Sequence, residues 1–290
     1  MINVLDHGFA RLVSYMQPAA RELAVFGTDD DFHADYNDDW TGDLEVVRNA
    51  RVSYDADWRT GDDQKDAKLV NYLTKNRHTS PFEAMVFTFE IKAPIFVIRQ
   101  WQRHRTWSYN EVSARYAELP EEFYVPAAEQ ITTQSASNKQ MRTTEQHPRA
   151  DLVRANIEVQ CIAAFNVYKL MLDTGVPREL ARGVLPLNTY TRMFATVDLH
   201  NLFHFLSLRL HEHAQFEIRV YAEALLQLIE PICPVAVAAF KEHRMHDISA
   251  ENAKMRDVLK RAEDAIEALD GTNIENEKLV DDYRALKGLL

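Results

Sequence analysis

The chain has 290 residues, 46% of them hydrophobic, and a formal net charge of −11. This length suffices for one large domain or two ordinary ones with a substantial core. The N-terminus lacks a basic flank before an apolar run, and no stretch approaches the roughly 20 apolar residues of a membrane span, so we expect a cytoplasmic protein without a membrane partner. Two cysteines, Cys161 and Cys233, are too few for a disulfide framework or a thiolate zinc site. None of the 8 glycines forms a dinucleotide-binding turn or a phosphate loop.

The negative charge is concentrated in two segments. Residues 28–45 hold eight acids and no Lys or Arg, and residues 247–290 hold eleven acids and seven bases. The rest of the chain therefore has 25 acidic and 26 basic residues. Because salt screens exposed charges beyond about 8 to 10 Å, one concentrated basic patch can dominate its neighbourhood there.

In chain order, the first predicted element is an opening strand or short helix. The Asp- and Asn-rich insertion over 28–45 then predicts a solvated loop. Asp35, Asn37 and Asp39 alternate as ligands do in calcium loops. The glycine and glutamate that an EF-hand loop needs next are missing, so calcium is the less favoured reading.

The middle of the chain predicts shorter elements. Apolar spacing predicts a helix over 67–75, and Ser80 with Glu83 three residues later has the pattern of a capping box. Alternation over 85–92 predicts a strand. Pro94 then begins a buried helix that runs to Gln102.

The second half of the chain predicts helices. One covers 150–173 and ends at Gly175, and another starts at Pro177 and stops near Pro186. Helical spacing over 199–229 predicts a single central buried helix. A heptad-like seam between 255 and 286 could pack in cis or join subunits. We therefore expect an α+β fold, in which a sheet from the N-terminal half is packed by long C-terminal helices.

The segment 99–116 is the one most suited to chemistry. It holds four arginines, one histidine and one acid. Guanidinium groups bind phosphate in a bidentate manner and stay charged, so this composition favours a phosphorylated ligand. Gln100, Asn110 and Ser113 add the directional donors and acceptors that a flat heterocycle needs.

Two other interpretations remain open for the segment 99–116, and a third concerns a histidine pair elsewhere in the chain. The arginines could form a solvated basic face or ion pairs at the edge of the core. Trp101, Trp107 and Tyr109 could be stacking platforms for single-stranded nucleic acid, although the basic character stops within one segment. His200 and His204 are spaced for a metal on one helix face, but no H-E-x-x-H pattern accompanies them, so we expect no metal.

A longer motif lies inside this segment. Arg103-His104-Arg105 is followed, after seven residues, by Ser113. This pattern resembles the R-H-R-x7-S signature of the flavin-dependent thymidylate synthases, and the resemblance covers roughly residues 1 to 245. The continuation over 108–116 also resembles the family, and the other blocks that resemble it are 50–54, 78–82, 86–101, 175–179, 181–182, 185–188, 190–192 and 213–215.

The resemblance implies an enzyme that methylates dUMP to dTMP. The carbon donor would be methylenetetrahydrofolate, and FAD would relay a hydride from NADPH. It also implies a homotetramer with active sites between subunits and a catalytic domain over 1–245. The Asp-rich insertion and the expected helical, charged C-terminal extension over 246–290 lie outside the resemblance. We expect no nucleic-acid partner. Two rivals stay open: a flavin-dependent pyrimidine nucleotide hydroxymethylase, and a non-catalytic nucleic-acid-binding or scaffold homologue.

The resemblance further assigns roles to individual residues. Arg209 would stabilise charge that develops on the uracil ring, and His78 would act near the flavin and the folate. The implied cofactor-binding residues are Ser80, Arg103, His104, Arg105, Glu111, Asp198, Leu199, His200 and His204. The implied substrate-binding residues are Gln100, Trp101, Gln102, Arg103, Glu111, Val112, Ser113, Ala114, Arg115, Arg182 and Arg209.

Two of these assignments carry a physical condition. No base is evident beside Ser113, so we expect it to hydrogen-bond the nucleotide rather than act as a nucleophile. Asp198 stands where relatives often have Asn. An acid near cofactor phosphates is unfavourable unless it faces ribose hydroxyls or pairs with a neighbour.

Overall fold

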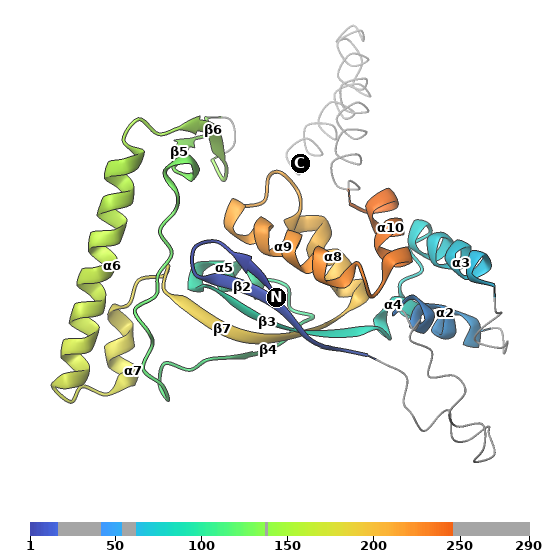
Figure 1. The fold of residues 1–290 in the computed structure, drawn as a ribbon, viewed down its shortest axis with the longest axis horizontal. Helices are drawn as coiled ribbons and strands as arrows, with labels where there is room; N and C mark the ends of the chain where they lie inside the picture. Colours follow the sequence, from blue (N-terminus) through green and yellow to red (C-terminus); the bar gives the residue numbers. More distant parts are fainter. Residues whose placement is uncertain (17–41, 54–61, 137–138, 246–290) are drawn as a thin grey trace, which may run out of the picture. The chain divides into compact units, whose positions relative to one another are not determined.

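A five-stranded antiparallel sheet organises the part of the chain that the computed structural model describes, residues 1–16, 42–53, 62–136 and 139–245 (Figure 1). Its order is β1 (Ile2–Val4), β2 (Gly8–Tyr15), β3 (Val86–Pro94), β7 (Tyr190–Asp198) and β4 (Ser108–Glu111). Strands β3 and β7 pair along their whole length, from Val86 opposite Asp198 to Pro94 opposite Tyr190. This pairing joins the two halves of the chain at the centre of the sheet.

The position of β7 corrects one expectation. We expected the sheet to come from the N-terminal half, yet one of its central strands lies at 190–198. Its burial alternates with the period of two expected for a strand, because Met193 and Ala195 are buried while Arg192 and Phe194 are exposed. The α+β class itself is confirmed.

Three helices pack against the sheet and against each other: α5 (Ile95–Trp101), α8 (Leu199–Arg209) and α9 (Phe216–Ile229). Trp101 is fully buried among them, and its ring stacks on Phe205 of α8 with 4.7 Å between ring centroids. Another group of helices packs together beside α8 and α9: α2 (Gly42–Val52), α3 (Asp63–Lys75), α4 (Ser80–Glu83) and α10 (Pro234–His243).

The prediction of a single helix over 199–229 is wrong. Helix α8 ends at Arg209, and α9 begins only at Phe216. In the turn between them the backbone finds other partners, since His213 N donates to His211 Nδ1 over 3.1 Å and Arg219 donates to the Glu212 carbonyl over 3.3 Å. Polar side chains therefore replace the helical hydrogen bonds that the apolar spacing predicted.

The helix predicted over 150–173 is confirmed as α6 (Ala150–Asp173), and Gly175 beyond it has the positive φ of +83° that suits a glycine after a helix. Next come α7 (Arg178–Ala181) and the 3-10 turn η2 (Arg182–Val184). A small core of its own holds this part together, with Phe165, Tyr168 and Ala181 fully buried. A two-stranded hairpin of β5 (Thr132–Gln134) and β6 (Arg142–Gln146) follows the short turn η1 (Ala128–Gln130).

The shorter predicted elements are found close to their expected places. The helix predicted over 67–75 is α3, which starts earlier because Asp62 accepts hydrogen bonds from two backbone N–H groups of its first turn. The strand and the Pro94-initiated helix are β3 and α5. The capping box is wrong: Ser80 already lies inside α4, and Thr79 at the cap position makes no side-chain cap bond.

Several expectations lie outside the described residues: the Asp-rich stretch up to residue 41, its calcium-like alternation and the seam between 255 and 286. Residues 42–45 of the expected loop instead start α2, and Asp43 is buried there. Within the described ranges no helix is long and apolar enough to cross a bilayer.

Candidate functional site

The R-H-R motif directly follows α5, and two tryptophans fix its position. Trp101 and Trp107 are buried, with ring centroids 5.6 Å apart. The Tyr109 hydroxyl donates to the carbonyls of Trp101 and His104, over 3.2 and 2.9 Å. Together with the bond from His104 N to the Trp101 carbonyl, over 2.9 Å, they hold the turn that follows α5. The buried indoles are core side chains, which removes them as stacking platforms for nucleic acid, and any contact of Trp101 with a ligand would use its backbone.

The central contact of the motif joins it to the end of α8. Arg209 Nε donates to His104 Nε2 over 3.0 Å, and Arg209 Nη2 reaches the Gln100 carbonyl oxygen over 3.5 Å. His104 is 7% exposed and lies edge-on to Phe205, with ring centroids 4.8 Å apart. Residues assigned from two distant parts of the sequence, the segment around His104 and the end of α8, therefore meet within one chain.

Burial, aided by this contact, sets the charge state of His104. Burial, the Arg209 guanidinium and His204 together lower the pKa of His104 to about 4. The imidazole is therefore neutral at neutral pH, and Nε2 accepts a hydrogen bond as an unprotonated nitrogen. Burial also lowers the pKa of Arg209, which stays charged because a guanidinium starts so high.

Arg103 and Arg105 flank the buried histidine on the outside. Both are exposed, and neither guanidinium has a hydrogen bond or an ion pair within the described ranges. A cation without an acidic partner remains available for an anionic ligand.

A second group of assigned residues lies along α5 and β4. Glu111 accepts from Thr191 Oγ1 over 2.8 Å and from Gln102 Nε2 over 3.5 Å. Val112 N donates to the Arg192 carbonyl over 2.9 Å and so continues the pairing of β4 with β7. Thr191 was not assigned any role from the sequence, although it lies in a block that resembles the family.

Ser113, Arg115 and Arg182 form a separate group. Ser113 Oγ accepts from Arg115 N over 3.3 Å, and Arg115 pairs with Glu179 of α7 over 3.6 Å. Arg182 is exposed in η2 and has no side-chain partner among the described residues. Figure 1 shows α7 beside α6 and away from α8. One chain thus brings Arg209 to the motif but leaves Arg115 and Arg182 in the region of α7 and η2. Ala114, next to Arg115, is buried.

The assigned cofactor residues at the start of α4 and α8 share a small cavity. His78 and His200 line it, together with Arg77, Arg244 and Thr79, over an apolar floor that includes Phe82 and Phe203. No carboxylate is among its lining residues. The cavity measures about 20 Å³ and holds little more than one water molecule, so a cofactor would lie across its mouth. Ser80 is exposed nearby on α4.

The acid at position 198 has a structural role. Asp198 is the N-cap of α8, where it accepts from Asn201 N over 2.8 Å and from Asn201 Nδ2 over 2.6 Å. These bonds pair the carboxylate with a neighbour, which is the condition for an acid at this place. Leu199 is fully buried, and burial, His200 and Arg244 lower the pKa of His204.

The surface has larger hollows that are alternative candidates for a site. Two larger hollows, of about 650 and 760 Å³, are lined by β1, α6, α9 and the segment around Tyr124, and by none of the assigned arginines. No group of three or more metal-ligating side chains occurs in the described part of the chain. The arginine and histidine cluster at the ends of α5 and α8 therefore remains the best candidate site.

Comparison with known proteins places this architecture in a family. The family profile described as thymidylate synthase complementing protein matches residues 37–235. The chain is 42% identical over 282 residues to a flavin-dependent thymidylate synthase of Treponema denticola, with 96% of each chain covered. It is 43% identical to an enzyme of that name from Thermus thermophilus over 258 residues, which cover 88% of this chain and 83% of the other.

A solved structure agrees with these relatives. The UMP/dUMP methylase PolB from Streptomyces cacaoi, bound with 5-Br dUMP, matches with a TM-score of 0.67 and 32% identity, covering 84% of this chain and 99% of that one. The chain therefore belongs to the family of the flavin-dependent thymidylate synthases.

Proposed function

We propose that the chain converts dUMP to dTMP in the cytoplasm, with methylenetetrahydrofolate as the carbon donor, FAD as the bound cofactor and NADPH as the reductant. The contact between Arg209 and the buried neutral His104 carries the proposal within the structure. It places a fixed cation, held on one side by an uncharged ring, beside the R-H-R motif that the family shares. The named relatives supply the reaction class.

The neutral state of His104 has a direct consequence for Arg209. A protonated histidine would repel the guanidinium. The neutral ring instead accepts a hydrogen bond from Arg209 Nε and leaves the terminal nitrogens of the guanidinium to face a ligand. A guanidinium directed at the uracil would stabilise negative charge that develops at N3 and O4. In a site shielded from water, one fixed donor of this kind contributes on the order of 100-fold or more in rate.

The remaining nucleotide contacts are proposed for the exposed arginines. Arg103 would bind the nucleotide from the motif, and Arg115 and Arg182 would bind its phosphate from the region of α7. Because one chain keeps these groups apart, we propose a homotetramer in which a neighbouring subunit brings Arg115 and Arg182 to Arg209. Ser113 would donate its hydroxyl to the nucleotide.

The residues around α4 and α8 fit a phosphate-bearing cofactor. The small cavity offers guanidinium and imidazole donors without a carboxylate, and Arg105 adds an exposed cation. We propose that FAD is held by His78, Ser80, Arg105, His200 and His204. Asp198 would affect FAD binding only indirectly, because it caps the start of α8. When bound, FAD would supply the hydride transfer that NADPH drives.

A second candidate rests on the solved structure, because that methylase is named for both UMP and dUMP. The experiment is anaerobic turnover of the purified protein with NADPH and methylenetetrahydrofolate, given dUMP or UMP in parallel, with the product identified by mass. We expect yellow protein and dTMP from dUMP. A hydroxymethyl product would instead support the hydroxymethylase. A colourless protein that takes up no FAD and shifts oligonucleotides would support the non-catalytic homologue.

A further inference from the structure

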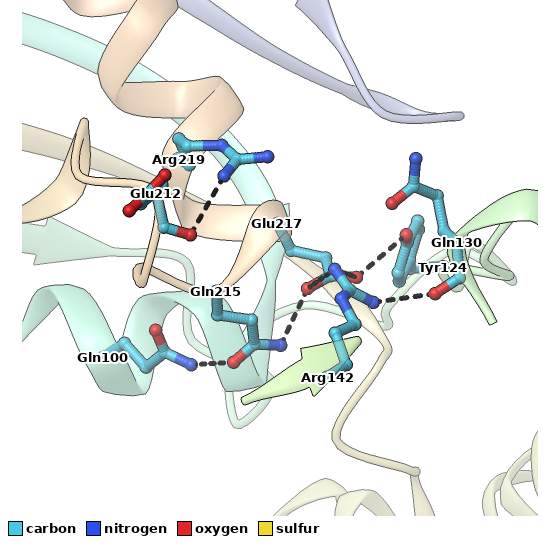
Figure 2. A network of polar contacts seen from close by, with 8 residues as sticks. All are labelled: Gln100, Tyr124, Gln130, Arg142, Glu212, Gln215, Glu217 and Arg219. Carbon is cyan, nitrogen blue, oxygen red and sulfur yellow. Dashed lines mark hydrogen bonds and ion pairs between the residues drawn. The ribbon is translucent and has the colours of Figure 1, made fainter. Parts of the chain in front are cut away.

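A chain of polar side chains leads from the motif into the buried start of α9 (Figure 2). Glu217, the second residue of α9, is 3% exposed. It accepts from Gln215 Nε2 over 2.8 Å, and Gln215 in turn accepts from Gln100 Nε2. Gln100 is the α5 residue whose carbonyl oxygen meets Arg209. The family resemblance assigns Gln100 to the nucleotide but assigns no role to Gln215 or Glu217.

The buried end of this chain is held firmly. The carboxylate of Glu217 meets Arg142 of β6, at 3.2 Å from one oxygen and 3.3 Å from the other, and Tyr124 donates its hydroxyl over 3.3 Å. Arg142 also donates to the Gln130 carbonyl over 2.9 Å. A desolvated charge with this many donors is costly to disturb, so the position of its oxygens is fixed.

The direction of every hydrogen bond in the chain follows from that carboxylate. A carboxylate only accepts, so Gln215 must turn its NH2 group toward Glu217. The Gln215 carbonyl oxygen then faces Gln100, which must donate its own NH2 group. One acceptor at the inner end therefore sets the orientation of two amides, although an isolated amide can flip freely.

From this geometry we propose that Glu217 and Gln215 are positioning residues that leave the Gln100 Oε1 oxygen, and not its NH2 group, to face the nucleotide. The inference depends on the proposed function, since it adds a specificity element to the same site. At neutral pH dUMP has two kinds of hydrogen-bond donor, the N3–H of the base and the 3′-hydroxyl. An oriented acceptor would bind one of these two and reject a nucleotide that lacks it, because an unpaired polar group would be left facing the oxygen.

The test replaces the middle of the chain without touching Gln100. In Gln215→Met the side chain has similar length but neither donates nor accepts, so the Gln100 amide is free to flip. The matched control is Gln227→Met, which makes the same change at an exposed position of α9. Binding of dUMP, dCMP (no N3–H) and 2′,3′-dideoxyuridine monophosphate (no 3′-hydroxyl) is measured by calorimetry on the FAD-loaded protein, together with kcat and KM for dUMP.

We expect the unmodified protein and Gln227→Met to favour dUMP over both analogues. Because dCMP also lacks the O4 acceptor proposed to face Arg209, the donor that Gln100 binds is named by the analogue whose rejection weakens in Gln215→Met. In Gln215→Met that preference for dUMP should fall about tenfold, with KM raised and kcat little changed. Unchanged preferences in Gln215→Met, with dUMP still bound, overturn the positioning role alone. Failure of the unmodified protein to bind dUMP overturns the proposed function and this inference with it.

Two further variants separate orientation from stability. Glu217→Gln keeps the shape but can donate as well as accept, so it should lower the dUMP preference in the same direction. Arg142→Met keeps the carboxylate and removes its ion pair, so it should lower the melting temperature and leave the preference intact. If the dUMP preference fell in step with the melting temperature in both variants, the role of Glu217 and Gln215 would be purely structural.

Discussion

Arg209 combines two features that are usually in conflict, partial burial and permanent charge. It is the last residue of α8, where the helix dipole favours a cation. Its neighbour His104 stays neutral because burial and the guanidinium itself lower the pKa of that ring to about 4. The pair therefore presents one positive charge, and the direction of that charge is fixed by the hydrogen bond between the two side chains.

Replacement of Arg209 by Ala should affect turnover far more than flavin content. The cation acts on charge that develops during reaction, so we expect a fall in kcat on the order of 100-fold or more. Lys241→Ala serves as control, because Lys241 of α10 pairs with Glu230, over 2.5 Å, away from the motif. Formation of dTMP and flavin absorbance per protein are the two measurements. Near-normal dTMP formation by Arg209→Ala would reject the assigned role.

Arg115→Lys tests the two-pronged contact proposed for the nucleotide phosphate. The ion pair with Glu179 joins two side chains that are each more than half exposed, 53% and 57%, so its loss should cost little stability. A lysine supplies a point charge and cannot bind two oxygens in parallel. We expect the Kd for dUMP to rise about tenfold while the melting temperature stays within about 1 °C. Unchanged affinity in a calorimetric titration would remove Arg115 from the site.

The neutral state of His104 also makes stability depend on pH. An unfolded chain binds a proton on this ring near pH 6.5, and the folded chain only near pH 4. Between these values the unfolded state binds more protons, so the contribution of His104 is fully present above pH 6.5 and is lost as pH falls toward 4. The melting temperature should therefore fall more steeply over this range in the unmodified protein than in His104→Asn. His7→Asn, which changes an exposed ring, should keep the steep slope.

At the scale of elements, Asp43 joins α2 to the start of α10. Its two oxygens accept from Val235 N and Ala236 N, each over 2.9 Å. Burial outweighs these bonds and raises the pKa of Asp43 to about 6. The folded state therefore binds the proton more tightly than the unfolded state, and the contribution of Asp43 improves as pH falls through 6. This trend is opposite to that of His104.

Removal of the Asp43 carboxylate should release the first turn of α10. Two backbone N–H groups would lose their partners, so we expect Asp43→Ala to lower the free energy of unfolding by about 1 to 2 kcal/mol. Asp63→Ala removes an acid from the exposed first turn of α3 and should cost well under about 1 kcal/mol. Urea unfolding at pH 7 measures both. Equal losses in the two variants would contradict a capping role for Asp43.

The elements differ in how well the sequence predicts them, and the physical reason differs from one element to the next. Helix α6 follows from its spacing and from Gly175. Strand β7 has a period of two that is visible in Met193 and Ala195, but its pairing with β3 joins positions about a hundred residues apart. The break between α8 and α9 depends on polar side chains that take over backbone bonds, as His211 does, and apolar spacing does not report such bonds.

The residues of the candidate site also differ in how well the sequence predicts them. The motif from Arg103 to Ser113 is contiguous, so its residues could be named from the sequence alone. Thr191 hydrogen-bonds Glu111, and Gln215 hydrogen-bonds Gln100. Both bonds form only once β7 and α9 have packed in place. Residues that act through another side chain leave no spacing pattern, because their role depends on the fold.

For the whole molecule, the distribution of the arginines is the informative property. Arg209 meets the motif within one chain, while Arg115 and Arg182 lie with α7. Long helix α6 beside them exposes large apolar side chains, among them Leu152 at 54%, Val159 at 60% and Leu170 at 62%. Patches of this kind on a chain surface favour contact with another subunit. A site completed by a neighbouring copy would explain both observations.

Complementation between two inactive variants tests this arrangement. Arg209→Ala and Arg182→Ala should each be nearly inactive alone. If every site takes Arg209 from one subunit and Arg182 from another, oligomers that contain both variants will have some sites with both arginines intact. We therefore expect co-expressed, differently tagged variants, purified through both tags, to regain a substantial fraction of dTMP formation. A site built within one chain has no intact copy in such a hybrid, so hybrids as inactive as their parents would place all the arginines in a single subunit.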